Sequence, residues 1–179
     1  MQKLSAKEVL AQYGAGRRDF AETDLAAIDL FEADLQEINL VSSNLTEAYL
    51  PYANLSYAKV ALAQAVAIEL SDAKLYQTDL SNANLAGANL SRVNLRGANL
   101  SGANLSGANL QNADLSNADL SNADLSKANL SRAILERTRL SGTKLYGCNL
   151  FRVQQCDLSE AYLDRLTVYP DGYRRYHDR

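Results

Sequence analysis

A five-residue period runs through most of the chain and limits the folds open to it. From Phe20 to Leu150, every fifth residue is a leucine, except at Phe20, Val60 and Ala65. The residue two positions earlier is small, most often alanine, and the residue between them is most often Asn or Asp. The other two positions favour Ser followed by Gly, Asn or Arg. A period this strict determines the architecture before any single residue does.

Neither regular element can bury a column of leucines with this spacing. On an α-helix five residues advance by about 500°, so successive leucines would scatter around the axis. In a straight strand, an odd period sends successive leucines to opposite faces. A short extended piece followed by a turn can bury them, because Ala and Leu two residues apart both point inward while Asn or Asp points outward. Since Ser-Gly and Ser-Asn pairs favour turns, we expect the chain to bend every five residues around a Leu and Ala core.

Two consecutive units, residues 98–102 and 103–107, both read Ala-Asn-Leu-Ser-Gly and resemble the pentapeptide-repeat family. The resemblance implies an all-β solenoid, a right-handed quadrilateral β-helix with four five-residue units per coil. We expect residues 18–168 to form this β-helix, with a frame slip near 151–157. Residues 1–17 would then be an N-terminal capping helix and link, and residues 169–179 a C-terminal cap or tail.

The ends of a solenoid expose backbone edges and apolar core, so they need covering. At the N-terminus, Ser5 and Glu8 form a capping-box pattern and Gly14 is a stop signal, which together predict a short helix. Four apolar side chains share one face of that helix: Ala6, Val9, Leu10 and Tyr13. A cap over the first coil is the favoured role, and a partner-binding helix is the alternative.

After Leu150 the period slips, because the next good units are residues 156–158 and 161–163. Residues 166–168, Leu-Thr-Val, read as a last partial unit, and Pro-Asp-Gly at 170–172 marks a turn. This ending and the N-terminal pattern resemble cyanobacterial members of the family. Three tyrosines would either cover the last coil or contact a second subunit: Tyr169, Tyr173 and Tyr176. We expect a monomer, with a dimer through the C-terminal end as the alternative.

The chemistry-bearing residues form no catalytic pattern. Three repeated carboxylates are five residues apart and so fall on successive faces, unsuited to paired acid–base work: Asp114, Asp119 and Asp124. The serines have no basic partner, and the single histidine, His177, lies in the tail. Cys148 and Cys156 fall at the small inward position, where we expect buried thiols; a disulfide would require the slip to align them. We therefore predict that the protein is not an enzyme and has no cofactor or metal.

Residues 60–69 keep the period but lose its chemistry, since Ala65 replaces Leu and Gln64 replaces Asn or Asp. Leu62 and Val66 fall where turn residues face outward. Either a local rearrangement tucks these side chains against the coil, or they form an apolar contact patch. Aromatic residues are enriched at interface centres, and tyrosines lie at outward positions close by. The candidate partner surface consists of Tyr49, Tyr52, Tyr57, Leu62, Val66 and Tyr76.

Charge is divided between the two halves of the chain. Residues 1–80 have a net charge of −6 and residues 81–179 a net charge of +3, which sum to −3. With four faces per coil, Arg92, Arg132 and Arg152 fall in one column. This column is either a solvated face or a candidate basic strip for an acidic partner. Nucleic acid is not favoured, because no aromatic residues interleave the arginines and the pI is about 5.2.

The preferred function is a rigid, non-catalytic rod that binds another, unidentified protein, in an interaction or regulatory role. The resemblance supplies one alternative, a DNA-mimicking protein that interacts with gyrase, but the modest charge and the arginine column argue against it. A rod with no specific partner is a third alternative. No apolar run is long enough to span a membrane and the N-terminus lacks an apolar signal core. We therefore expect no membrane partner and a cytoplasmic location.

Overall fold

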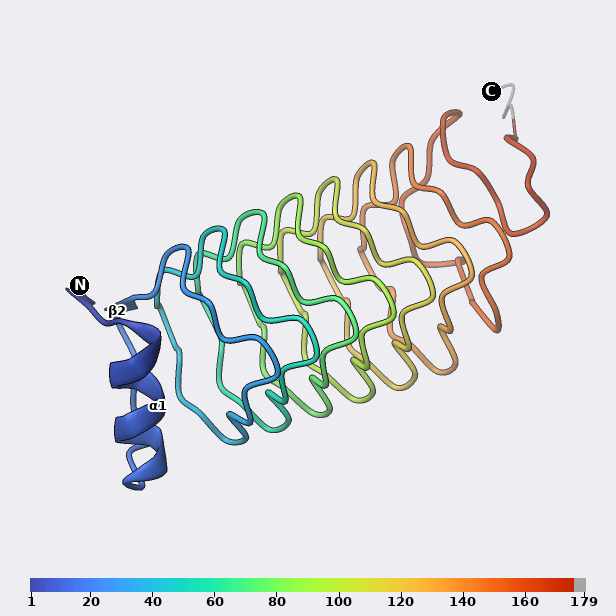
Figure 1. Ribbon diagram of the computed structural model, residues 1–179. Helices are drawn as coiled ribbons and strands as arrows, with labels where there is room; N and C mark the ends of the chain where they lie inside the picture. The colour runs from blue at the N-terminus through green and yellow to red at the C-terminus, as the bar shows by residue number, and fades with distance from the viewer. Residues whose placement is uncertain (176–179) are drawn as a thin grey trace.

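The computed structural model describes residues 1–175, which form a rod of stacked coils with the two termini at opposite ends (Figure 1). In each unit, three extended residues precede a two-residue turn. The outward residue of each unit pairs in parallel with the one twenty positions later, as Asn99 does with Asp119. Twenty residues per coil correspond to four units, so the expected right-handed quadrilateral β-helix is confirmed.

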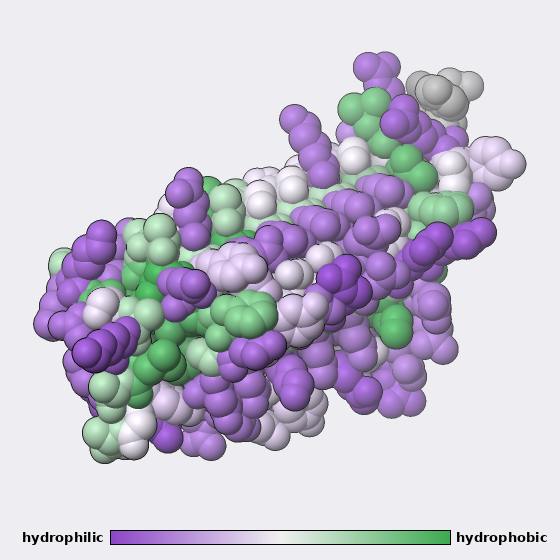
Figure 2. Space-filling view, in the orientation of Figure 1, coloured by the Kyte–Doolittle hydropathy of each residue, from purple (hydrophilic) through white to green (hydrophobic). Residues whose placement is uncertain are grey.

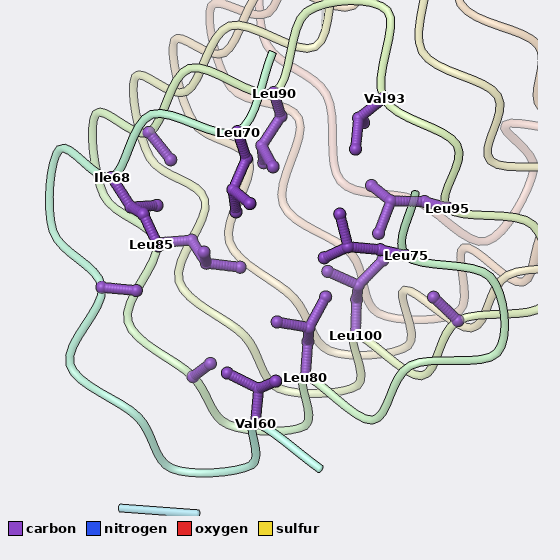
Figure 3. Close-up of a cluster of buried hydrophobic side chains, with 14 of the residues drawn as sticks. Val60, Ile68, Leu70, Leu75, Leu80, Leu85, Leu90, Val93, Leu95 and Leu100 are labelled. Atoms are coloured by element: carbon purple, nitrogen blue, oxygen red, sulfur yellow. The ribbon is translucent and has the colours of Figure 1, made fainter. Parts of the chain in front are cut away.

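The core of the rod is a column of leucines pointing inward from all four sides (Figure 3). Leu85, Leu90, Leu95 and Leu100, one from each side of a coil, are all fully buried. The residue two positions before the leucine, most often alanine, is buried in nearly every unit, and its small size leaves room for leucines of the adjacent units. Side chains therefore fill the interior, and stability comes mainly from contacts between neighbouring coils.

Each corner of the coil is a β-turn closed by the carbonyl of the inward leucine. The Leu95 carbonyl accepts a hydrogen bond from the Ala98 N–H at 3.0 Å, and the intervening Gly97 has a φ of +66°. A type II turn requires positive φ at this third position. The outward Asn or Asp fixes the corner as well: Asn99 Oδ1 accepts from the Ser101 N–H at 3.1 Å, while its Nδ2 donates to Asp79 Oδ1 at 3.1 Å. The repeated polar residue thus holds both the turn and the stack of coils.

A helix and a short strand cover the first coil (Figure 1). Strand β1 (Gln2–Lys3) pairs in parallel with β2 (Thr23–Asp24), and helix α1 (Ala6–Gly14) follows β1. Ser5 and Glu8 form the predicted capping box. Val9 is fully buried against the coil, and Tyr13 is partly buried with its hydroxyl donating to the Gln36 carbonyl at 2.9 Å. Ala6 also packs against the core, whereas Leu10, the fourth apolar residue of this helix face, is exposed.

Residues 60–69 remain in the regular coil, so the local rearrangement, one of the two alternatives for this segment, does not occur there. Gln64 pairs with both Asn44 and Asn84, twenty residues away on either side. Val60 and Ala65 occupy the inward position and are buried. The shorter side chains of Val60 and Ala65 therefore change how the core of this coil is packed, but the backbone keeps the regular coil geometry.

The regular pairing ends with Ile134 and Gln154 and resumes with Lys144 and Tyr162, which are only eighteen residues apart. Two turn residues are missing here, as the eight-residue spacing from Leu150 to Leu158 predicted. The last unit is residues 167–169 and not residues 166–168.

Asp164 explains this one-residue shift in the last unit. Its carboxylate accepts hydrogen bonds from the backbone N–H groups of Gly147 and Thr167, at 2.8 and 3.0 Å, and so accommodates an extra residue. Thr167 and Tyr169 are consequently buried, while Leu166 is exposed. Tyr173 is exposed as well, and Tyr176 and His177 lie outside the described residues.

Both cysteines are free thiols. Cys148 is buried and donates to the Leu125 carbonyl, and burial raises its pKa to about 12. Cys156 lies in the slipped segment and is only partly buried. Within residues 1–175, no helix is long and apolar enough to cross a membrane.

Candidate partner-binding surface

Three aromatic side chains form a cluster at one corner of the first two coils. Tyr49 is the outward residue of its unit, Tyr52 is the second turn residue of the same unit, and Phe31 is a turn residue of the coil before it. The Phe31 and Tyr49 rings are stacked with centroids 6.2 Å apart, and Phe31 meets Tyr52 edge-on at 5.9 Å. All three remain exposed, Tyr52 at 54%. The cluster is thus ordered by contacts among its own rings and lies outside the leucine core.

A second aromatic pair lies on the neighbouring edge of the rod. Tyr57 and Tyr76 occupy turn positions in successive coils, and their rings meet edge-on at 5.5 Å. Tyr57 is exposed and Tyr76 is half-buried. One face of the coil, bearing Asn54 and Lys74, separates this pair from the Phe31 cluster.

Leu62 and Val66 lie on the other two edges of the rod. Tyr52, Tyr57 and Leu62 hold the same turn position in three consecutive units, so each projects from a different corner. Leu62 is 55% exposed at the corner diagonally opposite Tyr52, and Val66 is half-buried at the corner after that. The six residues predicted as one partner surface therefore form two aromatic clusters on adjacent edges and two separate apolar residues.

The structure instead places Tyr52 of the aromatic cluster in the same row as the arginines of the predicted basic strip. Positions that differ by twenty stack in neighbouring coils, so one straight row carries Glu32, Tyr52, Asp72, Arg92, Asn112, Arg132 and Arg152. Phe31, Tyr49 and Phe151 lie beside it. We call this row with its three flanking aromatic residues the Tyr52 edge. Figure 2 shows hydrophobic surface gathered mainly over the N-terminal half of the face in view and hydrophilic surface over its middle.

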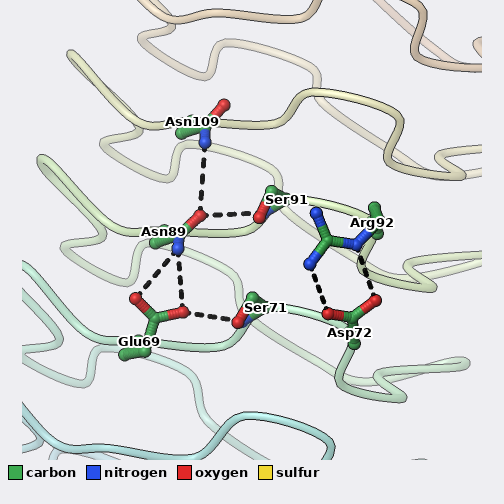
Figure 4. Close-up of polar contacts among 7 residues, drawn as sticks. All are labelled: Glu69, Ser71, Asp72, Asn89, Ser91, Arg92 and Asn109. Carbon is green, nitrogen blue, oxygen red and sulfur yellow. Dashed lines mark hydrogen bonds and ion pairs between the residues drawn. The ribbon is translucent and has the colours of Figure 1, made fainter.

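Arg92 is neutralised within the row. Its Nε and Nη2 donate to the two carboxylate oxygens of Asp72 at 2.8 and 2.6 Å, a bidentate pair across one coil step (Figure 4). The Arg92 guanidinium lowers the pKa of Asp72. Of the three predicted strip residues, Arg132 and Arg152 form no ion pair within residues 1–175, while the Arg152 guanidinium lies 5.0 Å from the centre of the Phe151 ring.

A hydrogen-bonded ladder supports the face next to this row. Asn109 Nδ2 donates to Asn89 Oδ1 at 3.3 Å, and Asn89 Nδ2 donates to both carboxylate oxygens of Glu69 at 2.9 Å (Figure 4). Asn89 Oδ1 also accepts the Ser91 N–H at 3.2 Å. These side chains hydrogen-bond to one another and to the backbone, which fixes their positions on this face.

Two carboxylates of the second half, Asp119 and Asp124, also form hydrogen bonds and ion pairs within the rod. Asp119 and Asp124 each accept a backbone N–H two residues on, at 2.9 Å. They also pair with Arg139 and Lys144 at 3.6 and 3.7 Å. A shallow polar hollow of about 540 Å³ lies at the frame slip, where Arg139, Ser141 and Glu160 line it. Within residues 1–175, no group of three His, Cys, Asp or Glu side chains is placed to hold a metal ion.

Comparison with known proteins agrees with this architecture. A family model described as pentapeptide repeats matches residues 28–62, 68–107 and 113–150, in eight copies. The chain is similar to HetL, a pentapeptide repeat protein involved in heterocyst differentiation regulation from Nostoc sp. strain PCC 7120, at 28% identity. That match covers 96% of this chain and 100% of HetL, with a TM-score of 0.38.

Two other solved structures are similar along most of the rod. Rfr23 from the cyanobacterium Cyanothece 51142 is 30% identical, over 79% of this chain and 90% of that chain, with a TM-score of 0.35. QnrB1, a plasmid-mediated fluoroquinolone resistance protein, is 19% identical over 82% of this chain and 79% of that chain, with a TM-score of 0.39. No functionally curated protein matches the chain. Since the family model matches well over half of its residues, the chain belongs to the pentapeptide repeat family.

Proposed function

We propose that the protein is a non-catalytic rod that binds another protein through the Tyr52 edge. The observation that carries the proposal is the exposed cluster of Phe31, Tyr49 and Tyr52, whose rings contact one another outside the core. The turn positions of the repeat are often Ser, Gly or Asn, so the turn itself requires no large aromatic residue there. Aromatic side chains bury much apolar area at low entropic cost and dominate interface energetics.

The arrangement of the polar side chains supports a binding role over a catalytic one. Buried leucines and alanines fill the interior of the rod between residues 20 and 150, where an enzyme would need space for a substrate. The carboxylates of Asp119 and Asp124 are used in turns and in ion pairs between coils. Cys148 is held as a neutral thiol by burial, which raises its pKa to about 12. A general base or an activated nucleophile needs a free partner within hydrogen-bonding reach.

Capture from a lysate of the source cells tests the proposal, with bound proteins identified by mass spectrometry. Tyr52→Ser and Leu62→Ser are a matched pair, because both residues hold the same turn position, with φ near +60° and exposures of 54% and 55%. We expect at least one protein that wild type and Leu62→Ser retain and Tyr52→Ser loses. Retention of every captured protein by Tyr52→Ser would remove the Tyr52 edge as the binding surface.

The gyrase alternative is tested separately by a supercoiling assay. A DNA mimic needs a continuous run of unpaired negative charge, whereas Asp72 is paired with Arg92, and Asp119 with Arg139. We therefore expect excess protein to leave the supercoiling activity of purified gyrase unchanged. Inhibition or protection of gyrase at stoichiometric protein would favour the alternative.

A further inference from the structure

We propose that the Tyr52 edge binds one continuous segment of a partner protein, apolar or aromatic at one end and acidic at the other. The inference rests on the proposed function and states the chemistry of the segment that is bound. It follows from the structural finding that Tyr52, with its aromatic neighbours beside it, shares one straight row with two arginines that form no ion pair within residues 1–175, an arrangement set by the twenty-residue stacking of the coils.

The aromatic end of the row selects apolar side chains. Phe31, Tyr49 and Tyr52 together expose ring surface whose burial stabilises a complex by roughly 25 cal/mol per Å² of apolar area. Glu32 stands in the same row immediately before Tyr52, and Asp29 lies beside Phe31 on the first coil. Since these carboxylates would repel an acidic segment, the acidic end of the partner is excluded from this part of the edge.

The basic end of the row selects carboxylates. Arg132 and Arg152 are exposed in successive coils, about 4.8 Å apart along the stack, and neither has an acidic partner within residues 1–175. Acidic residues on the flanking positions are already engaged, Asp114 with Arg96 at 3.9 Å and Asp171 with Arg175 at 3.3 Å. Two neighbouring guanidinium groups repel each other, so a carboxylate placed between them forms charge-assisted hydrogen bonds with both.

The middle of the row is neutral and sets the length of the segment. Asp72 and Arg92 satisfy each other, and Asn112 follows them, so a bound segment needs no charge there. Tyr52 is four coils from Arg132 and five from Arg152, or about 19 to 24 Å at the spacing of stacked strands. An extended segment of about seven residues or a helix of about sixteen spans this distance.

Site-specific photo-crosslinking in the source cells tests the inference with the full-length chain. The photoreactive residue p-benzoylphenylalanine replaces Tyr52, Asn112 or, as the control on the opposite edge, Leu62. Mass spectrometry then maps the crosslinked residues of the partner. We expect positions 52 and 112 to crosslink to one partner segment of at most about sixteen residues. Apolar residues should lie at the contact of position 52, and Asp or Glu just beyond the contact of position 112.

Charge reversal separates this inference from the proposed function. Arg132→Glu combined with Arg152→Glu should reduce crosslinking from position 112 at least tenfold, while Lys127→Glu, at the same turn position on a neighbouring edge, should leave it unchanged. Unchanged melting curves establish that the variants fold. The inference is overturned, and the proposed function is not, if position 52 crosslinks to a protein but crosslinking from position 112 is absent or does not respond to the charge reversal. Crosslinking of position 112 to a nucleic acid has the same consequence. If position 52 crosslinks to no protein above the level of the Leu62 control, both the inference and the proposed function are overturned.

Discussion

Replacing one inward leucine, Leu105→Ala, tests the physical basis of the rod. Leu105 is fully buried, and the change removes three carbon atoms, worth about 2.4 kcal/mol of transfer free energy at about 0.8 kcal/mol each. The coils on either side cannot close over the gap, because hydrogen bonds of 2.7 Å link Leu85 N–H to the Asn104 carbonyl and Leu105 N–H to the Asp124 carbonyl. An uncollapsed cavity adds a further cost, so we expect a total loss of about 3–5 kcal/mol.

Urea unfolding followed by circular dichroism measures this loss as a difference in the free energy of unfolding. Leu62→Ala is the control, because Leu62 is a leucine of the same β-helix but is exposed at a turn. Its replacement should change stability by less than about 0.5 kcal/mol. A loss below about 1 kcal/mol for Leu105→Ala would refute the argument that stacked coils hold the leucine column rigidly.

Three further measurements examine the turns and the C-terminal end. Gly107→Ala should cost about 1 kcal/mol of unfolding free energy, because φ at Gly107 is +68° although no atom lies within 4 Å of the added Cβ. The control Gly14→Ala, at the end of α1, should not lower the free energy of unfolding. A loss equal to that of Gly107→Ala would contradict the argument that the positive φ of the turn causes the cost. Burial favours a raised pKa for Asp164, but hydrogen bonds from Gly147, Leu166 and Thr167 outweigh it and lower the pKa. Its stabilising contribution is therefore present above the usual aspartate pKa and lost as pH falls towards the lowered value. The melting temperature of Asp164→Asn should thus lie below that of wild type at pH 7 and approach it at pH 3; a constant difference would contradict this. Burial protects Cys148 more than Cys156, so a thiol reagent should modify Cys156 first and Cys148 only after unfolding. Equal rates of modification of the two cysteines in the folded protein would place Cys148 at the surface.

Most of the fold could be predicted from the sequence, because one period governs both the core and the turns. The period alone required a bend every five residues, whereas four units per coil came from the family resemblance. The capping helix was predictable from Ser5 and Glu8 because a capping box is a local interaction. The register of the last unit was not, since it depends on hydrogen bonds that Asp164 makes to Gly147, seventeen residues away.

The candidate site was predictable only in part. Tyr49 and Tyr52 were identified by their outward positions, but Phe31 was missed because it is eighteen residues from Tyr49 in sequence. The twenty-residue register contains the missing signal: it places Phe31 beside Tyr52 and Leu62 on the opposite edge. It also stacks Asp72 on Arg92, so that one arginine of the predicted strip is neutralised. The angles between the aromatic rings depend on side-chain packing in three dimensions, which no repeat pattern specifies.

The most direct test of the central claim is the affinity of the captured partner for the purified rod, measured by isothermal titration calorimetry. The variants Tyr52→Ser and Leu62→Ser each replace a large exposed side chain at the same turn position, but on opposite edges of the rod. If the Tyr52 edge is the binding surface, Tyr52→Ser should weaken binding by about thirtyfold or more, the loss that corresponds to an interface hot spot of about 2 kcal/mol. Leu62→Ser should leave the affinity within about twofold. Equal affinities for the two variants, or a larger loss for Leu62→Ser, would contradict the account.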